Sequence, residues 1–371
     1  MHARQATPRN LRARAALTAA AVAIAAMAAL IGSTGAAATH QTNSAGAAPS
    51  VPWGFNEDWG WGRADFRASV AGRQLSFAGQ VMPDAASANR FHVQWAAVEE
   101  SRGRYRWGKT DRVYHAMRLY SAQPVMVLYN APVWARDPHA ACHNDAACAY
   151  PPRVKHLDEW RRFVRRAVER YPEVRAIEVW NEPNLGRFWS PAPDPRRYGA
   201  ILKGVYEAAR AERSSKPVLV GGLAPAGNTA TTVGAAEFLK QLYASACACY
   251  FQGIATHPYT TQVPLVDNVA KRLDKIRAVR DAAADSAKRL WITEFGLSSN
   301  GTSDVTLENQ GSELAQVYRS IEGHDVAAFV IHRFHDVGFD GPYWNETGIV
   351  REDLSLKPAY CQLGELIGTA C

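Results

Sequence analysis

The 371-residue sequence lacks the segments that mark several common classes of protein. Beyond its first forty residues, no stretch is long and apolar enough to span a bilayer. No glycine-rich phosphate loop, nucleophile-elbow serine or His-Glu-x-x-His helix is present, so the sequence gives no support for the chemistry of those motifs. Lysine and arginine are spread over helical faces and form no single block, and nucleic-acid binding is therefore not expected.

The first 38 residues have the features of a secretory signal peptide. Four arginines precede an apolar run over residues 15–31, and the small residues Ala36 and Ala38 follow at a cleavage-like position. An uncleaved membrane anchor is the alternative. Cleavage would lower the formal net charge from +7 to 7 − 4 = +3. We therefore expect bacterial-type secretion, a disordered leader over residues 39–50 and one folded domain over residues 51–371.

Six cysteines in an exported chain predict disulfides, and their spacing is local. Short loops favour pairing between sequence neighbours. A ring closed by two cysteines one residue apart would be strained, which leaves the pairing of Cys247 and Cys249 open. Metal ligation by "CHNDAAC" is an alternative, but an oxidising compartment favours a disulfide there. The pairs that we expect are Cys142–Cys148 and Cys361–Cys371.

Short apolar segments alternate with amphipathic helical stretches, the clearest of which span residues 156–171 and 198–209. From Trp53 in the first segment to Phe329 in the last, seven intervals average (329 − 53)/7, or about 39 residues. Such alternation predicts parallel strands with crossover helices. We therefore expect an α/β fold, a (β/α)8 TIM barrel, with a doubly wound open sheet as the alternative. The expected strands are VPWGFN, NRFHVQW, PVMVLYNAP, AIEVWNEP, PVLVGGLAP, GIATHPY, RLWITEFG and AAFVIHRFHD.

Polar residues gather at the expected carboxyl ends of these strands, where TIM barrels place their active sites. Glu182 ends the fourth strand and Glu294 lies near the end of the seventh. These two strands face each other across an eight-stranded ring, so both carboxyl groups can reach one substrate atom. Cleavage of a glycosidic bond needs such a pair, one to protonate the leaving oxygen and one to attack or to activate water. Repulsion between close carboxylates can keep one of two such groups protonated.

These motifs resemble those of a known group of enzymes. "VWNEPN" and "WITEFG" resemble the two catalytic-glutamate motifs of glycoside hydrolase clan A, and "NEPNLGRFW" resembles its family 39 and related, family 5-like branches. "RFHVQWAAVEESRGRYRW" and "SLKPAY" resemble the second strand and the start of the last helix in that clan. The likeness covers nearly all of residues 52–366 and implies a (β/α)8-barrel glycosidase.

The resemblance also implies roles for single residues. Glu182 corresponds to the general acid and base, Glu294 to the nucleophile, and Asn181 to the partner of the sugar 2-hydroxyl. The sixth strand matches a His-x-Tyr pattern at His257 and Tyr259, in which the tyrosine supports the nucleophile. Arg90 matches a basic residue of the second strand that keeps the nucleophile ionised, although a purely structural pairing with a buried carboxylate is the alternative for Arg90.

The eighth strand departs from the pattern of the clan. Many members place a tryptophan there as a floor for the bound sugar, whereas this chain has "VIHRFHD". His332 and His335 are therefore either substrate contacts or buried histidines. Two or three of six tryptophans are expected as flat surfaces on which sugar rings stack, the others being core residues; the six are Trp53, Trp59, Trp61, Trp134, Trp189 and Trp344. The further candidate substrate contacts are Asn130, Trp134, Trp189 and His332.

We therefore expect a secreted, monomeric, retaining glycoside hydrolase that acts on a poly- or oligosaccharide by double displacement. The resemblance favours a β-linked glycan. No cofactor, metal, nucleic acid or membrane partner is expected once the signal peptide is removed. The alternative is a catalytically silent barrel that only binds polysaccharide, against which the presence of both glutamates argues.

Overall fold

The computed structural model describes residues 51–56, 88–119, 122–142, 148–245, 248–338 and 341–365. The predicted signal peptide and leader lie outside these ranges, and so do Trp59 and Trp61. Within them, every helix is too short or too polar to cross a membrane.

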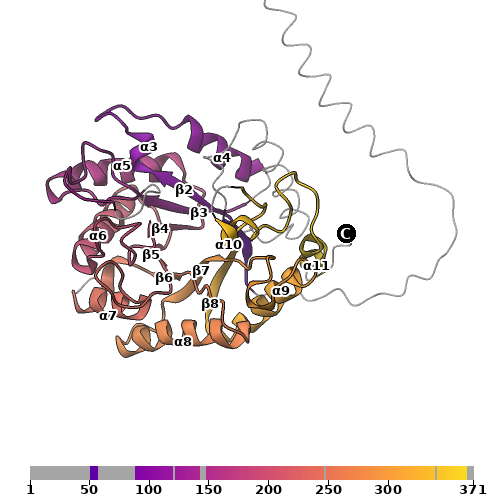
Figure 1. The fold of residues 1–371 in the computed structure, drawn as a ribbon. Coiled ribbons are helices and arrows are strands. Elements are labelled where there is room, and N and C mark those ends of the chain that lie inside the picture. The colour runs from indigo at the N-terminus through magenta and orange to yellow at the C-terminus, as the bar shows by residue number, and fades with distance from the viewer. Residues whose placement is uncertain are drawn as a thin grey trace, which may run out of the picture. The chain divides into compact units, whose positions relative to one another are not determined.

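Eight parallel strands form one sheet in the order β1-β8-β7-β6-β5-β4-β3-β2. Figure 1 shows them at the centre of a ring of helices. Each lies within or next to one of the eight predicted segments, so the expectation of a TIM-type barrel is confirmed. The strands are β1 (Trp53–Phe55), β2 (Arg90–Gln94), β3 (Val125–Tyr129), β4 (Ala176–Asn181), β5 (Val218–Leu223), β6 (Gly253–Thr256), β7 (Arg289–Phe295) and β8 (Val326–Ile331).

The barrel is nearly closed where β1 meets β2. Asn56, just after β1, forms a parallel bridge with Arg90 at the start of β2. The backbone N–H of Phe55 donates to the side-chain oxygen of Asn89 at 2.8 Å, and that of Ala88 donates to the carbonyl of Trp53 at 3.0 Å. These contacts bring the first and second strands side by side, which places Asn56 next to the side chain of Arg90.

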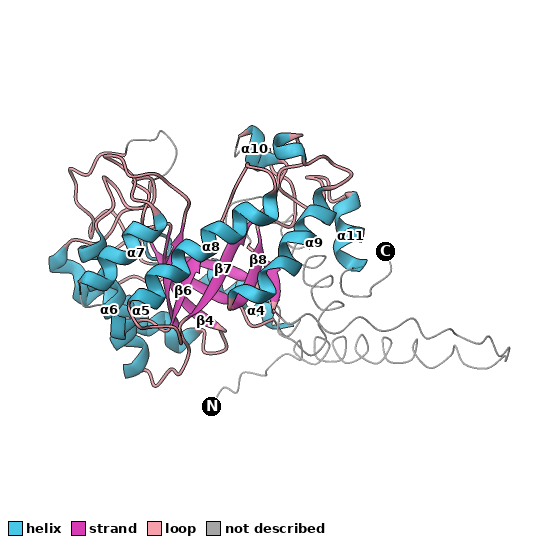
Figure 2. Ribbon diagram, turned by 90° about the horizontal axis from the view of Figure 1, so that it is seen from below, coloured by secondary structure: helices cyan, strands magenta, loops and turns pink. Residues whose placement is uncertain are grey.

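Helices cover the outside of the sheet, and α10 lies near its carboxyl end beyond β8 (Figure 2). Helix α5 buries Trp160, Phe163 and Val164 on one face and carries acidic residues in its first turn. Helix α6 begins after Asp194, whose side chain accepts the N–H of Arg197 at 2.9 Å. The helices are α3 (Trp95–Val98), α4 (Gly108–Leu119), α5 (Leu157–Arg170), α6 (Pro195–Ala211), α7 (Ala235–Ala244), α8 (Leu265–Ala282), α9 (Gln310–Ser320), α10 (Pro342–Asn345) and α11 (Pro358–Glu365).

Two apolar clusters stabilise the fold. The larger one lies between the strands and the surrounding helices and contains most of the buried aromatic side chains. The smaller one takes a residue from each of six consecutive strands, β3 to β8, and fills the barrel interior with mostly small side chains. These six residues are Val125, Ala176, Leu219, Ala255, Trp291 and Ala328. The polar residues described below lie above this layer, toward the carboxyl ends of the strands.

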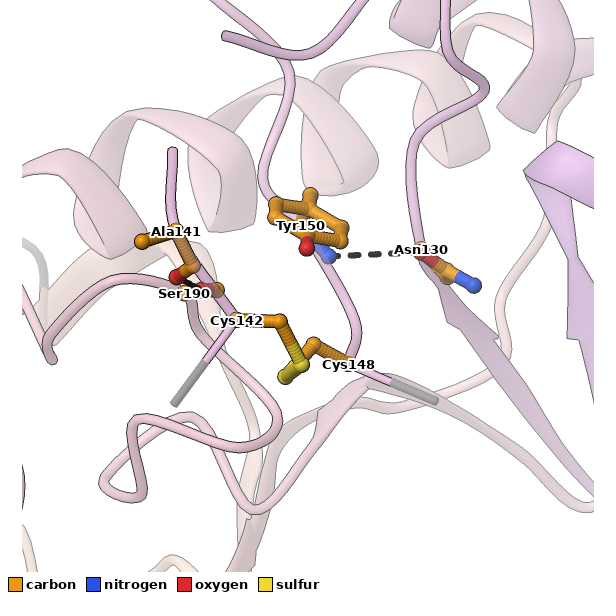
Figure 3. Close-up of a disulfide and its surroundings, with 6 residues drawn as sticks. All are labelled: Asn130, Ala141, Cys142, Cys148, Tyr150 and Ser190. Carbon is orange, nitrogen blue, oxygen red and sulfur yellow. Dashed lines mark hydrogen bonds between the residues drawn. A yellow bond between two sulfur atoms is a disulfide. The ribbon is translucent and has the colours of Figure 1, made fainter. Parts of the chain in front are cut away.

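The predicted disulfide between Cys142 and Cys148 is present, with 5.7 Å between its Cα atoms. The disulfide joins two parts of the long loop between β3 and α5. Hydrogen bonds next to it also hold this loop in place (Figure 3). Cys361 is also disulfide-bonded, while its predicted partner lies outside the described residues. Cys249 is a free, exposed thiol, so the short ring whose pairing was open does not form.

Candidate active site

The two glutamates predicted to act together meet at the carboxyl end of the barrel. One carboxylate oxygen of Glu182 and one of Glu294 lie with His257 Nδ1 in a group whose atoms are all within 4.8 Å of one another. Glu182 follows the last residue of β4, Glu294 lies in β7, and His257 follows β6. The convergence expected from strands four and seven is therefore present.

The backbone around Glu182 adopts an uncommon conformation. Trp180 has φ 76° and Glu182 has φ 44°, both in the left-handed region that costs a residue with a side chain about 1–3 kcal/mol. The buried side chain of Asn184 holds this turn, donating to the carbonyls of Ala224 and Val233 at 2.8 Å each and accepting the N–H of Ala224 at 3.0 Å. Asn184 belongs to the motif "NEPNLGRFW", but nothing in that motif separately indicates this role.

Glu294 is surrounded by donors. Its Oε1 accepts from the guanidinium of Arg90 and, at 3.0 Å, from the amide of Asn56, and its Oε2 accepts from the hydroxyl of Tyr259 at 3.3 Å. Burial alone would raise the pKa of Glu294, but the positive charges of His257, Arg90 and nearby histidines outweigh burial and lower this pKa to about 2. Glu294 is therefore ionised at neutral pH, as an attacking carboxylate must be.

Arg90 makes both of the contacts that were considered as alternatives. Its Nε and Nη2 atoms donate to the two oxygens of Glu178 at 2.8 and 2.9 Å, while Nη1 contacts Glu294. Nη2 also donates to Asn181 Oδ1 at 2.8 Å, which fixes the orientation of that amide. Burial lowers the pKa of Arg90, but the charges of Glu178 and Glu294 more than compensate and raise it, so the guanidinium stays charged. One arginine thus joins a structural carboxylate to the site.

His257 lies between the two glutamates. Its Nδ1 is 2.8 Å from Glu182 Oε1 and 3.6 Å from Glu294 Oε2, and its Nε2 is 3.2 Å from Thr293 Oγ1. The Glu294 oxygen that faces His257 is Oε2, which already accepts from Tyr259, while Oε1 accepts from Arg90. A cation in this group would have to displace the hydroxyl of Tyr259 from Oε2.

Tyr259 remains a neutral donor. Burial, followed by the charges of Glu294 and Glu182, raises the pKa of its hydroxyl well above the usual value. Its ring packs edge-on against Trp344 at 5.0 Å, and Trp344 also packs against His332 at 5.8 Å. His332 is buried, and its Nδ1 lies 3.2 Å from the amide nitrogen of Asn56. The amide of Asn56 therefore links His332 to Glu294, while a contact of His332 with substrate stays a prediction.

Two other candidate substrate contacts, Asn130 and Trp134, make hydrogen bonds within the protein. The side chain of Asn130 donates to Gln94 at 3.2 Å. It also accepts the N–H of Tyr150 at 3.2 Å and so holds the loop after β3 (Figure 3). The indole of Trp134 donates to the carbonyl of Glu99 at 3.0 Å and packs against His156, which ties it to the outer helix layer.

The prediction that Trp189 contacts substrate is wrong. Its side chain is 1% exposed and packs between Trp180 and Tyr198, with ring centroids 5.0 and 5.7 Å away. The loop after Glu182 turns this indole inward, onto α6, because burial of so large an apolar surface stabilises the fold. Trp53 is likewise a buried core residue.

Sequence reasoning missed three polar residues of the site, namely Asn56, Glu178 and Thr293. Glu178 had a usable signal, because it is a charged residue inside the otherwise apolar start of "AIEVWN". Asn56 and Thr293 had none, since a single polar residue at or near a strand end is common. All three are at least 98% buried. Asn56 binds Glu294 directly, Glu178 binds Arg90, and Thr293 binds His257.

Comparison with solved structures finds the same fold in several glycosidases. A family 39 glycoside hydrolase from Bacteroides cellulosilyticus WH2 matches with TM-score 0.61 and 21% identity, over 80% of this chain and 61% of that one. A monomeric beta-xylosidase from Caulobacter crescentus CB15 matches with TM-score 0.61 and 19% identity, over 86% and 68%. A GH5_18 enzyme from Bifidobacterium longum subsp. longum matches with TM-score 0.63 and 14% identity, over 85% and 78%.

These identities show a shared fold, and the chain spans about three fifths of the length of the first of these relatives. No curated protein sequence matches the chain. The family described as "Glycosyl hydrolase catalytic core" matches residues 134–335, which is more than half of the chain and includes Glu182 and Glu294. The chain therefore belongs to the glycosyl hydrolase catalytic core family.

Proposed function

We propose that the protein is a secreted, retaining glycoside hydrolase that cleaves a β-linked poly- or oligosaccharide. The observation that carries the retaining mechanism is the short separation of the two glutamates, whose nearest ligand-type oxygens are within 4.8 Å. Retaining enzymes hold their carboxyl groups roughly 5–5.5 Å apart, whereas inverting enzymes leave roughly 6.5–9.5 Å for a water molecule. The spacing favours direct attack by one carboxylate.

In the first step, a carboxylate oxygen of Glu294 forms a bond to the anomeric carbon as the bond to the leaving oxygen breaks. Glu182 gives its proton to that oxygen, so the leaving sugar departs neutral. Arg90, Asn56 and Tyr259 suit this role for Glu294 because all three donate hydrogen bonds to a charged carboxylate. They also turn its oxygens to fixed positions.

In the second step, water attacks the anomeric carbon of the glycosyl-enzyme. Glu182, now a carboxylate, takes a proton from this water, and the bond to Glu294 breaks to restore the starting enzyme. Asn181 has its amide oxygen held by Arg90. This leaves the NH2 group of Asn181 available to donate to a sugar hydroxyl, in agreement with the predicted contact to the 2-hydroxyl.

The eighth strand supplies no tryptophan on which a sugar ring could stack. Trp344 lies against Tyr259 and His332, beside the proposed nucleophile, and is only partly buried. Lys357 holds the following segment by donating to the carbonyls of Glu346 at 3.2 Å and of Gly348 at 3.0 Å. We assign to Trp344 the function of the tryptophan that many clan members carry on strand eight.

The mechanism is tested by following the anomeric configuration of the first product by NMR. A retained configuration is expected, and an inverted one would refute the proposal. A 2-deoxy-2-fluoro glycoside of the right sugar should label the protein once, on the peptide that contains Glu294. Glu294→Gln should lose several orders of magnitude in kcat while it keeps substrate affinity. Binding without turnover by the unmodified protein across a panel of glycans would favour the silent, polysaccharide-binding alternative.

A further inference from the structure

A fully buried glutamate lies behind the two catalytic carboxylates and connects them. Glu178, on β4, accepts two hydrogen bonds from Arg90, one from the N–H of Gly222 at 2.8 Å and one from the hydroxyl of Thr293 at 3.2 Å. Arg90 continues to Glu294. Thr293 continues to His257, which meets Glu182. A chain of hydrogen bonds therefore runs from one catalytic carboxylate to the other without passing through the substrate.

The direction of each hydrogen bond in this chain follows from Glu178. A carboxylate whose two oxygens accept from two guanidinium nitrogens of one arginine is ionised and can only accept hydrogen bonds. The hydroxyl hydrogen of Thr293 is therefore committed to Glu178, and its oxygen can only accept from His257 Nε2, 3.2 Å away. His257 must carry a proton on Nε2.

The ring of His257 cannot escape this arrangement by turning. A β-carbon at Gly222 would lie 2.0 Å from Nε2, so the imidazole packs directly against the backbone of β5. Nδ1 faces Glu182 at 2.8 Å and Glu294 at 3.6 Å, while the ring of Tyr259 stands edge-on at 6.3 Å. Each nitrogen of His257 thus has a fixed partner.

A proton must also lie between Nδ1 and Glu182, because two lone pairs do not face each other at 2.8 Å. For Glu182 to present its own proton to a leaving group from its other oxygen, Nδ1 must carry the hydrogen, and His257 is then an imidazolium. After Glu182 has given its proton away, the same Nδ1–H group pairs with the carboxylate that remains. His257 keeps both of its protons through both steps.

We propose that Glu178 and Thr293 are positioning residues which, by fixing a proton on His257 Nε2, hold Glu182 in a state usable as acid and then as base. Glu178 also fastens Arg90 against Glu294, so one buried side chain orients both halves of the reaction. This inference rests on the proposed function, since it assigns the acid and base role to Glu182. Neither positioning residue contacts the substrate in this scheme.

The test compares Thr293→Val with Thr293→Ser. Valine has nearly the shape of threonine but removes both hydrogen bonds, whereas serine keeps the hydroxyl. Without an acceptor at Nε2, the proton on that nitrogen is no longer fixed by a hydrogen bond. The alkaline limb of kcat/KM should therefore move to lower pH by about one unit in Thr293→Val. Substrates with poor leaving groups should lose about tenfold in kcat/KM at pH above that limb, and activated aryl glycosides much less. Thr293→Ser should restore the wild-type profile.

A Thr293→Val profile that coincides with the wild type would overturn the proposal, and so would a Thr293→Ser variant that behaves like valine. A second measurement does not depend on turnover: 15N NMR of the intact protein with labelled histidine should show His257 protonated on Nε2, and a ring protonated only on Nδ1 would overturn the proposal. Failure of the proposed function appears separately, as an inverted product or absent hydrolysis in the wild-type protein.

Discussion

Asn56→Asp should convert a stabilising contact of Glu294, the proposed nucleophile, into a repulsive one. Asn56 is 2% exposed, and its amide donates to Glu294 Oε1 at 3.0 Å. An aspartate has the same shape but no donor, so two carboxylates would face each other and share one proton. Burial raises the pKa of Glu294, but the charges of His257 and Arg90 outweigh this effect and lower the pKa to about 2. An added negative charge acts in the opposite direction and raises this pKa.

The expected size follows from the distance. Two unit charges about 4 Å apart at an effective dielectric constant of 20 repel by about 4 kcal/mol, which corresponds to about three pH units. The acid limb of kcat/KM reports ionisation of the nucleophile in the free enzyme, so this limb should move to higher pH by up to that amount. The assay is a pH profile of kcat/KM on an activated aryl glycoside.

Asn56→Ala is the matched control, since it removes the hydrogen bond to Glu294 without adding charge. Its acid limb should move by a smaller amount in the same direction. Circular dichroism should show that both variants keep the fold. If the acid limb of Asn56→Asp coincided with that of Asn56→Ala, the electrostatic account of Glu294 would be wrong.

Three further predictions concern other parts of the molecule. Glu182→Ala should lose about 10²–10⁴-fold in rate on substrates with poor leaving groups, while the first step on activated aryl glycosides is largely kept; equal losses on both would contradict its role as acid. Trp344→Ala should raise KM by about tenfold and change kcat less, and an unchanged KM would exclude sugar stacking there. Replacing Cys142 and Cys148 by serine should lower the free energy of unfolding by about 2 kcal/mol, measured by urea denaturation.

The sequence was sufficient to predict the eight strands and the pair of glutamates. Runs of β-branched and aromatic residues are typical of buried parallel strands, and Glu182 and Glu294 each stand directly in or after such a run. The direction in which a loop side chain points is harder to predict from the sequence. Trp189 and Trp344 both lie in loops, yet one fills the space between Trp180 and Tyr198 while the other remains partly exposed beside Tyr259. Only tertiary packing distinguishes the two.

The directions of the side chains at the carboxyl ends of β4 and β7 could not be predicted from the alternation of inward and outward residues, because both strands break this alternation. Along β4, Ala176 and Glu178 face the barrel interior, and period two would place Trp180 there as well. The left-handed φ of Trp180 instead sends its indole to the outer cluster and turns Asn181 inward to Arg90.

Along β7, Trp291 and Thr293 face inward, and alternation would point the next residue, Glu294, outward. A shift of register between Ile292 and Phe295 removes that constraint, and the carboxylate of Glu294 faces Arg90 in the site. Each of the two glutamates thus lies where its strand departs from regular geometry. In a regular strand, either Thr293 or Glu294 would point into the apolar helix layer. The unpaired charge of Glu294 would cost several kcal/mol there. The two irregularities therefore let neighbouring residues face the same site: Asn181 and Glu182 at the carboxyl end of β4, and Thr293 and Glu294 in β7.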